Sequence, residues 1–316
     1  MEKNRKPNRR ISLPKRLLTA ALALLIAAGI ALIVGGIIST RSNDTITVSN
    51  YEVRSEKMTG EGFRIVLISD LHRKLFDETN QQLVDIAAAQ QPDVICVDGD
   101  MLEPDYTEEE ADALVSLFER LVSIAPVYFA AGNHDYTVFC DFIEKRGDEL
   151  IAMYGVSELR ERLEATGAVF LESSMTDVTI RGEKVRIGGF YPFAIRRSED
   201  TDESWERRRS FLEDFCSSTD FKLMLSHRPD SFTKEDAAEL WDIDLVLSGH
   251  THNGVIALPF GLGAIWTNEG FFPKHDMGIF HEGKITMVIT GGLDGHNGVP
   301  RVYNPPEIAV IDVLPE

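Results

Sequence analysis

Cysteine is scarce in this 316-residue sequence: Cys96, Cys140 and Cys216 are the only ones, and no Cys-x-x-Cys pair occurs. This odd count excludes a fully paired disulfide framework and argues against a cysteine-ligated zinc site. Glycine, with 24 residues, and proline, with 13, are too few for a fibrous repeat. Hydrophobic residues make up 43% of the chain, too many for a disordered one, so we expect a folded core that includes Cys96.

Positive charge is also in deficit, with 32 Lys and Arg against 51 Asp and Glu and a formal net charge of −19. So acidic a chain repels a polyphosphate backbone at long range, and we expect no nucleic-acid partner. Basic residues gather in a tail at residues 1–16, and at Arg196, Arg197 and Arg207-Arg208-Arg209. These arginines would either meet a second phosphate or anionic lipid headgroups, or pair with glutamates one helical turn away.

One long apolar run, residues 17–38, contains no charged residue. As a helix it would span about 33 Å, which matches the hydrocarbon core of a bilayer. Because the basic tail precedes it, the positive-inside rule predicts a single-pass protein of the cell membrane whose body lies on the extracytoplasmic side. A cleaved signal peptide is the alternative, and Arg9-Arg10 allows a twin-arginine export route; the length of the run favours an uncleaved signal anchor.

The rest of the chain divides into a polar segment and a regular body. Residues 39–62 predict a stalk, and residues 63–316 predict one domain. Apolar runs typical of buried strands occur at 63–69, 93–97, 126–132, 184–190, 221–226, 243–249, 284–290 and 307–313. Helical patterns lie at 79–90, 108–124, 157–166, 203–216 and 232–240, the second with a capping box from Thr107 to Glu110. This alternation predicts an α/β fold, completed near the C-terminus by a second sheet.

Polar side chains follow five of these apolar runs directly. Because ligands bind at the carboxyl ends of strands in α/β sheets, we expect these five strand ends to form one site. The motifs are Asp70-Leu71-His72, Gly99-Asp100, Gly132-Asn133-His134-Asp135, Ser226-His227 and Gly249-His250-Thr251-His252.

The residue types in these motifs indicate metal binding. In extended backbone, residues i and i+2 point to the same side, so we expect Asp70 to converge with His72, and His250 with His252. Carboxylate, imidazole and amide oxygen together favour Mn²⁺, Fe or Zn²⁺ over Ca²⁺. Seven ligands exceed the need of one ion, whereas two ions that share a bridging carboxylate would use them all. We place the remaining histidines, His275, His281 and His296, outside this site.

Over residues 63–313 the sequence resembles the calcineurin-like metallophosphoesterase superfamily. The resemblance lies in the order of its motifs, which is D-x-H, G-D, G-N-H-D, H and G-H-x-H. The motif S-H-R-P at 226–229 and the segment G-V-P-R-V-Y-N-P-P-E-I at 298–308 resemble its membrane-associated bacterial branch, which includes phosphodiesterases acting on lipid-linked substrates. The resemblance implies an α/β fold of two packed mixed β-sheets flanked by helices, a four-layer sandwich.

The resemblance also implies a role for each motif residue. His134 would lie beside the phosphate as a catalytic residue, and Asp135 would orient His134 by a hydrogen bond. Asn253 and Glu103 stand where the family has glycine and aspartate, which affects the expected shape of the substrate pocket. The metal ligands would be Asp70, His72 and His252 for the first ion, Asp100 as the bridge, and Asn133, His227 and His250 for the second.

The implied reaction is hydrolysis of a phosphodiester or pyrophosphate, of a lipid or cell-envelope substrate, by a hydroxide that bridges two divalent ions. Manganese is the expected metal, with zinc or iron as alternatives. The rival functions are a phosphomonoesterase or protein phosphatase and a catalytically silent metal-binding surface protein. The segment from Phe260 to Phe272, with Leu262, Ile265, Trp266 and Phe271, either lines a lipid-facing groove or belongs to the core.

Overall fold

The computed structural model describes residues 15–41, 43–140, 142–146, 149–190, 194–196, 201–234, 236–259, 263–267, 270–295 and 299–316. Most of the basic tail with Arg9-Arg10, together with Arg197, His296 and residues 260–262, lies outside the described residues.

The first sheet has six strands, in the order β1 (Thr47–Ser55), β16 (Glu307–Pro315), β2 (Phe63–Ile68), β3 (Val94–Asp98), β4 (Val127–Ala130) and β7 (Val169–Phe170). The last four run parallel, whereas β16 is antiparallel to β2 and parallel to β1. The segment 39–62, interpreted from the sequence as a stalk, therefore supplies the edge strand β1. Its alternation of half-buried and exposed residues suits an edge position.

The second sheet also has six strands, in the order β14 (Gly278–Glu282), β15 (Ile285–Ile289), β11 (Leu245–Ser248), β10 (Phe221–Leu225), β9 (Glu183–Gly189) and β8 (Ser174–Ile180). The four central strands are parallel and both edges are antiparallel. The edge strands β8 and β14 were not predicted from the sequence, because they are half-exposed and carry no continuous apolar run. Two small hairpins, β5 (Phe142–Arg146) with β6 (Glu149–Tyr154) and β12 (Trp266–Thr267) with β13 (Gly270–Phe271), complete the strands.

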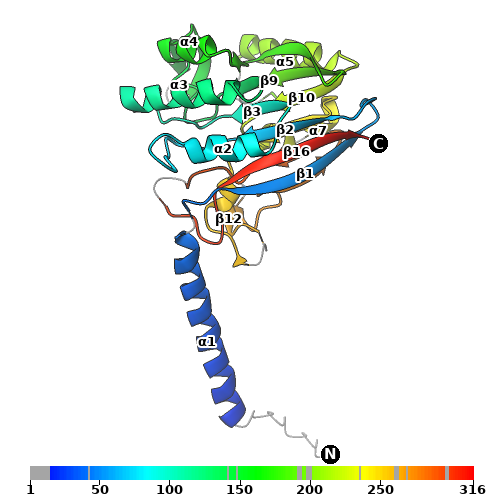
Figure 1. Ribbon diagram of the computed structural model, residues 1–316. Helices are drawn as coiled ribbons and strands as arrows, with labels where there is room; N and C mark the ends of the chain where they lie inside the picture. Colours follow the sequence, from blue (N-terminus) through cyan, green and yellow to red (C-terminus); the bar gives the residue numbers. More distant parts are fainter. Residues whose placement is uncertain are drawn as a thin grey trace, which may run out of the picture.

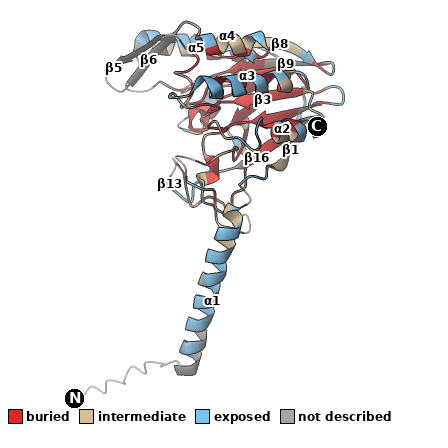
Figure 2. Ribbon diagram, turned by 60° about the vertical axis from the view of Figure 1, so that its left-hand side comes forward, coloured by how far each residue is buried: buried red, intermediate tan, exposed pale blue. Residues whose placement is uncertain are grey.

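Helices cover the outer face of each sheet (Figure 1). The first sheet packs against α2 (Gln81–Ala89), α3 (Glu108–Val122) and α4 (Glu158–Ala165), and the second against α5 (Asp202–Cys216), α6 (Asp230–Thr233) and α7 (Ala237–Leu240). A third apolar cluster, which includes Leu67, Cys96, Leu225 and Leu247, fills the space between the sheets. The predicted four-layer α/β sandwich is confirmed, and Figure 2 shows its central strands as buried.

One helix prediction is wrong, because the pattern at 232–240 forms two short helices instead of one. Lys234, directly after α6, has extended backbone with φ −93° and ψ 143°, which ends the helical hydrogen bonding. Phe232 in α6 and Ala237 in α7 are both buried, so the apolar pattern reports burial here without one continuous helix.

The apolar run near the N-terminus forms α1 (Lys15–Thr40), which projects from the sandwich with its apolar side chains exposed (Figures 1 and 2). Its segment Leu22–Thr40 has a mean hydropathy of 2.6 and is long and apolar enough to cross a membrane. The end of α1 contacts the domain through Tyr303. The Tyr303 hydroxyl donates to the Leu32 carbonyl at 2.7 Å, and Ser39 Oγ accepts from the Tyr303 backbone N–H at 2.6 Å.

Two arginines of α5, Arg207 and Arg209, pair with acidic residues of the same helix. Arg207 pairs with Glu203 at 3.3 Å, and Arg209 with Glu213 at 2.8 Å. Because α5 lies at the end of the domain away from α1 (Figure 1), these arginines do not face the side from which α1 projects. Of the two interpretations offered by the sequence, helix-face pairing is the one that the contacts support.

The predicted capping box gives a test of how local sequence stabilises α3. Thr107 Oγ1 accepts from the Glu110 backbone N–H at 3.3 Å, and the Glu110 carboxylate accepts from the Thr107 N–H at 2.8 Å. Thr107→Ala should lower the free energy of unfolding by about 1 kcal/mol, measured by urea denaturation in detergent. Thr107→Ser keeps the hydroxyl and should stay close to the wild type; an equal loss in both variants would contradict the capping role.

Candidate metal centre

The five polar strand ends predicted from the sequence meet at one place in the structure. They follow β2, β3 and β4 of the first sheet and β10 and β11 of the second, which pack face to face. Their side chains form three groups, each with candidate ligand atoms within 4.8 Å of one another: Asp70, His72 and His252; Asp100, His227 and His250; and His72, Glu103 and His134.

The expectation of extended backbone at these positions is wrong. Asp70, Asp100, His250 and His252 have φ angles of 56°, 53°, 68° and 49°, in the left-handed region. Each lies in the turn after its strand, where left-handed backbone turns the chain sharply. As a result, His250 and His252 join different groups instead of converging on one point. Such φ values cost about 1–3 kcal/mol for non-glycine residues and cluster at functional sites.

Two glycines allow these turns to approach one another. Gly99 has φ 78°, and a Cβ there would collide with the backbone of Gly132. A Cβ at Gly249 would collide with the side chains of Ser69 and Asp70. The turn after β11 therefore lies against the turn after β2, and the His250 backbone N–H donates to the Asp70 carboxylate at 3.1 Å.

Two buried carboxylates lie at the centre of the site. Asp70 Oδ1 is 3.4 Å from His252 Nε2, 3.8 Å from His227 Nε2 and 4.0 Å from His72 Nε2. Asp100 Oδ2 is 3.0 Å from His227 Nε2 and 3.8 Å from His72 Nε2. Donor atoms that share a metal ion at about 2.0–2.2 Å each are about 3–3.5 Å apart, so this spacing approaches that of a coordination sphere.

Hydrogen bonds at Nδ1 fix the orientation of three histidine rings. His227 Nδ1 donates to the Asp98 carbonyl at 2.6 Å, and His252 Nδ1 donates to the Asp294 carbonyl at 2.9 Å. His72 Nδ1 lies 2.7 Å from Glu103 Oε1. Because a carbonyl oxygen can only accept, Nδ1 carries a proton in His227 and His252, which leaves Nε2 as the ring atom that can bind a metal ion.

Polar atoms that lack hydrogen-bond partners provide a test of fit for metal ions. His72 Nε2 and Asn133 Oδ1 are buried and have no partner, and His227 Nε2 and Asp100 Oδ2 face each other without hydrogen-bond geometry. An unpartnered buried polar atom is costly, and here all four belong to predicted ligands. The donor set of carboxylate, imidazole and amide oxygen therefore fits divalent transition-metal ions.

Protonation favours cation binding as well. Burial by itself would raise the pKa of Asp70 and Asp100, but attraction to His252 and His227 outweighs it and leaves both pKa values below the ordinary range. Burial lowers the pKa of His252 to about 4 and that of His250 to about 3, so both rings are neutral at pH 7. Ionised carboxylates and neutral imidazoles are the forms that bind metal ions. His227 is the exception: burial lowers its pKa, but Asp100 and Asp70 raise it well above the ordinary value, so a metal ion that binds this ring displaces a proton.

Glu103, noted in the sequence only as a departure from the family pattern, has a central position. Its carboxylate lies 2.7 Å from His72 Nδ1 through one oxygen and 2.7 Å from His134 Nδ1 through the other. The prediction that Asp135 orients His134 is wrong. The buried carboxylate of Asp135 accepts from the backbone N–H groups of Met101 and Gly132, so it holds the turns, and Glu103 contacts the ring.

A buried hydrogen-bond network that was not predicted from the sequence supports His252. Arg301, 1% exposed, donates to the Asp294 carbonyl at 2.6 Å, the same oxygen that accepts from His252 Nδ1. The Asn304 side chain donates to the His252 carbonyl at 2.7 Å. Both residues lie in the 298–308 segment that resembles the bacterial branch, and this resemblance was the signal that could have identified them.

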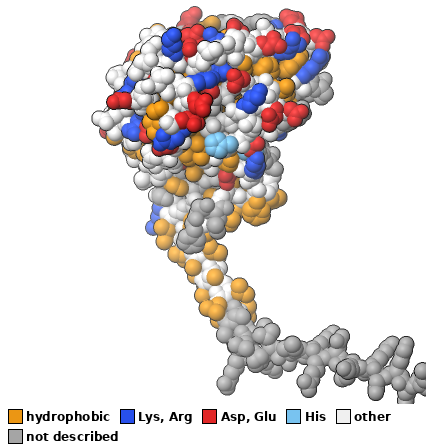
Figure 3. All heavy atoms as spheres, turned by 90° about the vertical axis from the view of Figure 1, so that its right-hand side faces the viewer, with side chains coloured by type: hydrophobic (Ala, Val, Ile, Leu, Met, Phe, Trp, Pro, Cys, Tyr) orange, Lys and Arg blue, Asp and Glu red, His pale blue; other side chains and the backbone are white. Residues whose placement is uncertain are grey.

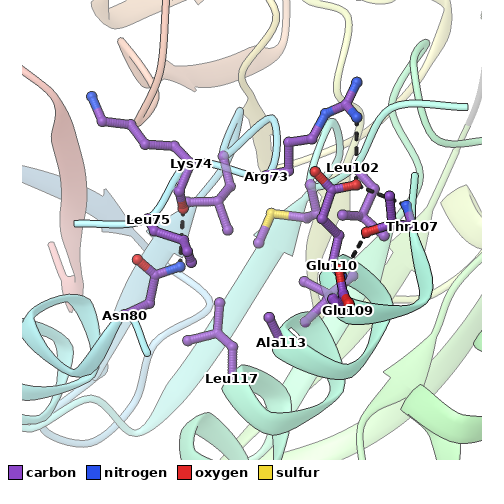
Figure 4. A pocket seen from close by; sticks show the side chains of 13 residues that line it. Arg73, Lys74, Leu75, Asn80, Leu102, Thr107, Glu109, Glu110, Ala113 and Leu117 are labelled. Carbon is purple, nitrogen blue, oxygen red and sulfur yellow. Dashed lines mark hydrogen bonds and ion pairs between the residues drawn. The ribbon is translucent and has the colours of Figure 1, made fainter. Parts of the chain in front are cut away.

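The metal site opens into a cavity of about 310 Å³. Its lining combines the site residues Asp100, Asn133, His134 and His250 with the apolar residues Val255, Ile256 and Val299. A second cavity of about 360 Å³ lies between residues 71–80 and α3 (Figure 4). No histidine of the cluster is among the described residues that line it, and Arg73, which does line it, pairs with Asp105 at 2.6 Å and Glu110 at 3.4 Å.

Two histidines lie outside the cluster, as expected from the sequence. His275 Nε2 is 2.9 Å from Glu282 Oε1, and His281 Nδ1 is 3.2 Å from Thr286 Oγ1. Cys96 is buried between the sheets, as predicted.

Comparison with known proteins shows one consistent similarity. The family model of calcineurin-like phosphoesterases matches residues 63–254. A Caenorhabditis elegans protein named as a metallophosphoesterase is 25% identical over 245 residues, which cover 74% of this chain and 45% of that protein. The Danio rerio transmembrane protein with metallophosphoesterase domain is 26% identical over 297 residues, covering 92% of this chain and 61% of the relative.

A bacterial relative matches over most of its own length. The uncharacterised metallophosphoesterase YkuE of Bacillus subtilis is 26% identical over 254 residues, covering 79% of this chain and 78% of YkuE. By contrast, the chain spans about half the length of the nematode and zebrafish relatives.

Metal binding should stabilise the folded protein. Mn²⁺ at a hundredfold excess over its dissociation constant should add about 2.7 kcal/mol to the free energy of unfolding, seen as a rise in Tm that EDTA reverses. His252→Ala should lose most of this rise because it removes a donor near Asp70. His281→Ala, a histidine exposed on β14, is the matched control and should keep it. An equal Tm response in both variants would refute the site.

Glu103→Gln tests the double contact to His72 and His134. An amide offers one acceptor oxygen instead of two, so one ring loses its acceptor, and metal affinity should fall about 10- to 100-fold. Titration of the apoprotein with Mn²⁺, followed by calorimetry, measures this. Glu109→Gln makes the same chemical change at an exposed position and should leave the affinity unaltered.

Proposed function

The chain belongs to the calcineurin-like phosphoesterase family, and from that premise we propose that it hydrolyses a phosphodiester or pyrophosphate bond of a lipid or cell-envelope substrate. It is a metal-dependent phosphoester hydrolase, as the family motifs in the sequence predicted. The observation that carries the proposal is the meeting of all five motifs around the buried carboxylates Asp70 and Asp100.

We assign the metal ligands as two sets that share one carboxylate. The proximity of Asp100 Oδ2 to both His72 and His227 supports its assignment as the bridge. Manganese is the proposed metal, with zinc and iron as alternatives. The first set is Asp70, His72 and His252, and the second is Asn133, His227 and His250, with Asp100 common to both.

Bound divalent ions would supply Lewis-acid chemistry, stabilising phosphoryl oxygens and making a nucleophile available at neutral pH. The protein contributes a proton donor. His134 lines the cavity, and Glu103 engages its Nδ1, so Nε2 is the ring atom proposed to donate a proton to the leaving oxygen. Asp135 supports this geometry indirectly by holding the turn at Gly132.

The lining of the cavity favours a diester over a monoester. Among the described lining residues there is no lysine or arginine to balance the second charge of a phosphomonoester. Val255, Ile256 and Val299 instead provide an apolar wall beside the metal ligands, where a second organic substituent of a diester would lie. The same wall suits the alkyl part of a lipid-linked substrate.

We propose that α1 is an uncleaved anchor in the cell membrane. Its apolar exposed surface, the contact of its C-terminal turns with Tyr303 and the name of the zebrafish relative support this. The basic residues before α1 favour a single-pass topology with the domain on the extracytoplasmic side. The proposed boundaries are a tail at 1–16, the anchor at 17–38, a linker with β1 at 39–62 and the catalytic domain at 63–316.

Two substitutions separate metal binding from proton donation. Asp100→Asn should abolish hydrolysis of bis-p-nitrophenyl phosphate with loss of bound metal, because it removes the proposed bridge. His134→Ala should lower kcat by about 10²- to 10⁴-fold with metal largely retained, because it removes only the proton donor. Turnover is measured by p-nitrophenol release and metal content by elemental analysis.

His281→Ala serves as the control and should match the wild type in both measurements. Full activity in either site variant would refute the proposed roles. Faster hydrolysis of p-nitrophenyl phosphate than of the diester would favour the phosphomonoesterase function instead, since that substrate is a monoester.

A further inference from the structure

An exposed apolar surface adjoins the mouth of the metal-site cavity. Phe271 and Phe272, on and directly after β13, are 77% and 68% exposed. Ile256 and Val299 line the cavity and are themselves 39% and 45% exposed. We call Ile256, Phe271, Phe272 and Val299 the apolar rim.

The apolar rim is joined to the end of α1 by a continuous series of backbone contacts. Tyr303, which contacts α1, follows Val302, whose backbone pairs with Val255 and Ala257 on either side of Ile256. Ile256 accepts a hydrogen bond from Ile265, which in turn accepts one from Phe272. The rim therefore occupies the same end of the domain as α1, where Figure 3 shows hydrophobic side chains gathered.

The contact with α1 sets the depth of this end relative to a bilayer. The Tyr303 hydroxyl bonds to Leu32, six residues before Ile38, where the apolar run ends. Six residues of helix correspond to about 9 Å. If α1 crosses the bilayer, Tyr303 lies below the outer end of the span, and elements embedded in the interface typically reach about 5–10 Å into it.

From this geometry we propose that the apolar rim is embedded in the outer leaflet crossed by α1 and holds the mouth of the metal-site cavity at the level of lipid phosphates. The proposal rests on the membrane anchoring advanced above and adds to it the surface through which substrate arrives. A lipid phosphodiester would enter from the side with its chains still in the leaflet, past Ile256 and Val299.

Tight packing between α1 and the loop makes the arrangement testable from the helix side. A Cβ at Gly35 would collide with the Tyr303 hydroxyl, whereas a Cβ at Gly29 would meet no atom within 4 Å. Gly35→Leu and Gly29→Leu add the same apolar side chain to the same helix. Only Gly35→Leu should change how the domain sits on the membrane.

The first experiment measures depth directly. The full chain is placed in phosphatidylcholine nanodiscs with brominated acyl chains, and an environment-sensitive fluorophore is attached through Phe271→Cys or, as a control, Leu240→Cys, in a Cys216→Ser background. Leu240 is 61% exposed on α7, outside the rim. Quenching is expected at position 271 and not at 240, and Gly35→Leu should reduce it while Gly29→Leu does not. Absence of quenching at 271 would overturn the proposal.

The second experiment compares two substrates with the same leaving group. Hexadecyl p-nitrophenyl phosphate resides in the bilayer, whereas methyl p-nitrophenyl phosphate is soluble. Replacing Phe271 and Phe272 together by serine should slow hydrolysis of the bilayer substrate at least about tenfold, because the aromatic side chains supply the interfacial contact. Hydrolysis of the soluble substrate should stay within about twofold, and Leu240→Ser should affect neither.

The outcomes distinguish this inference from the proposed function. If the wild type hydrolyses neither the bilayer substrate nor the soluble substrate, the phosphodiesterase assignment itself is refuted. Suppose instead that the wild type hydrolyses the soluble diester normally, that the label at position 271 is not quenched, and that replacing Phe271 and Phe272 by serine affects both substrates equally. These results would refute only the membrane-embedded apolar rim, and a protein partner would then be the occupant of this surface.

Discussion

The structure depends on the burial of two carboxylates, Asp70 and Asp100, side by side at the junction of two sheets. Two like charges out of water repel each other and lose their hydration, which is costly unless opposite charge is supplied nearby. Histidines from both sheets surround them, and the pKa of His227 is raised well above its ordinary value by Asp100 and Asp70, although its burial acts the other way. The fold thus concentrates negative potential where a cation is needed.

The two sheets contribute unequal parts of this arrangement. The first sheet supplies the carboxylates and the proposed proton donor, and the second supplies His227, His250 and His252. Two of the three ligand groups need both sheets, because Asp70 needs His252 and Asp100 needs His227 within reach. Packing between the sheets, through buried residues such as Leu67 and Leu247, is therefore coupled to metal binding.

The proposed membrane anchoring bears on how an acidic protein meets an anionic substrate. The chain carries a net charge of −19, which opposes the approach of anionic phosphates from solution. Divalent ions would reverse the sign locally, and a substrate delivered within the plane of a membrane need not cross the field of the whole surface. The segment 299–306 contributes to both functions, since Tyr303 contacts α1 while Arg301 and Asn304 support His252.

The sequence by itself determined the apolar helix, the alternation of strands and helices, and the motif residues, because hydrophobic periodicity and strand-end chemistry are local properties. It assigned the orienting role to Asp135, and it predicted extended backbone where Asp70 and His250 are left-handed. Only the tertiary structure decided that Glu103 contacts His134, that residues 47–55 join the first sheet, and that Arg301 supports the far side of His252. Those contacts join residues distant in sequence, and the geometry that selects among chemically equivalent partners exists only once both sheets have packed.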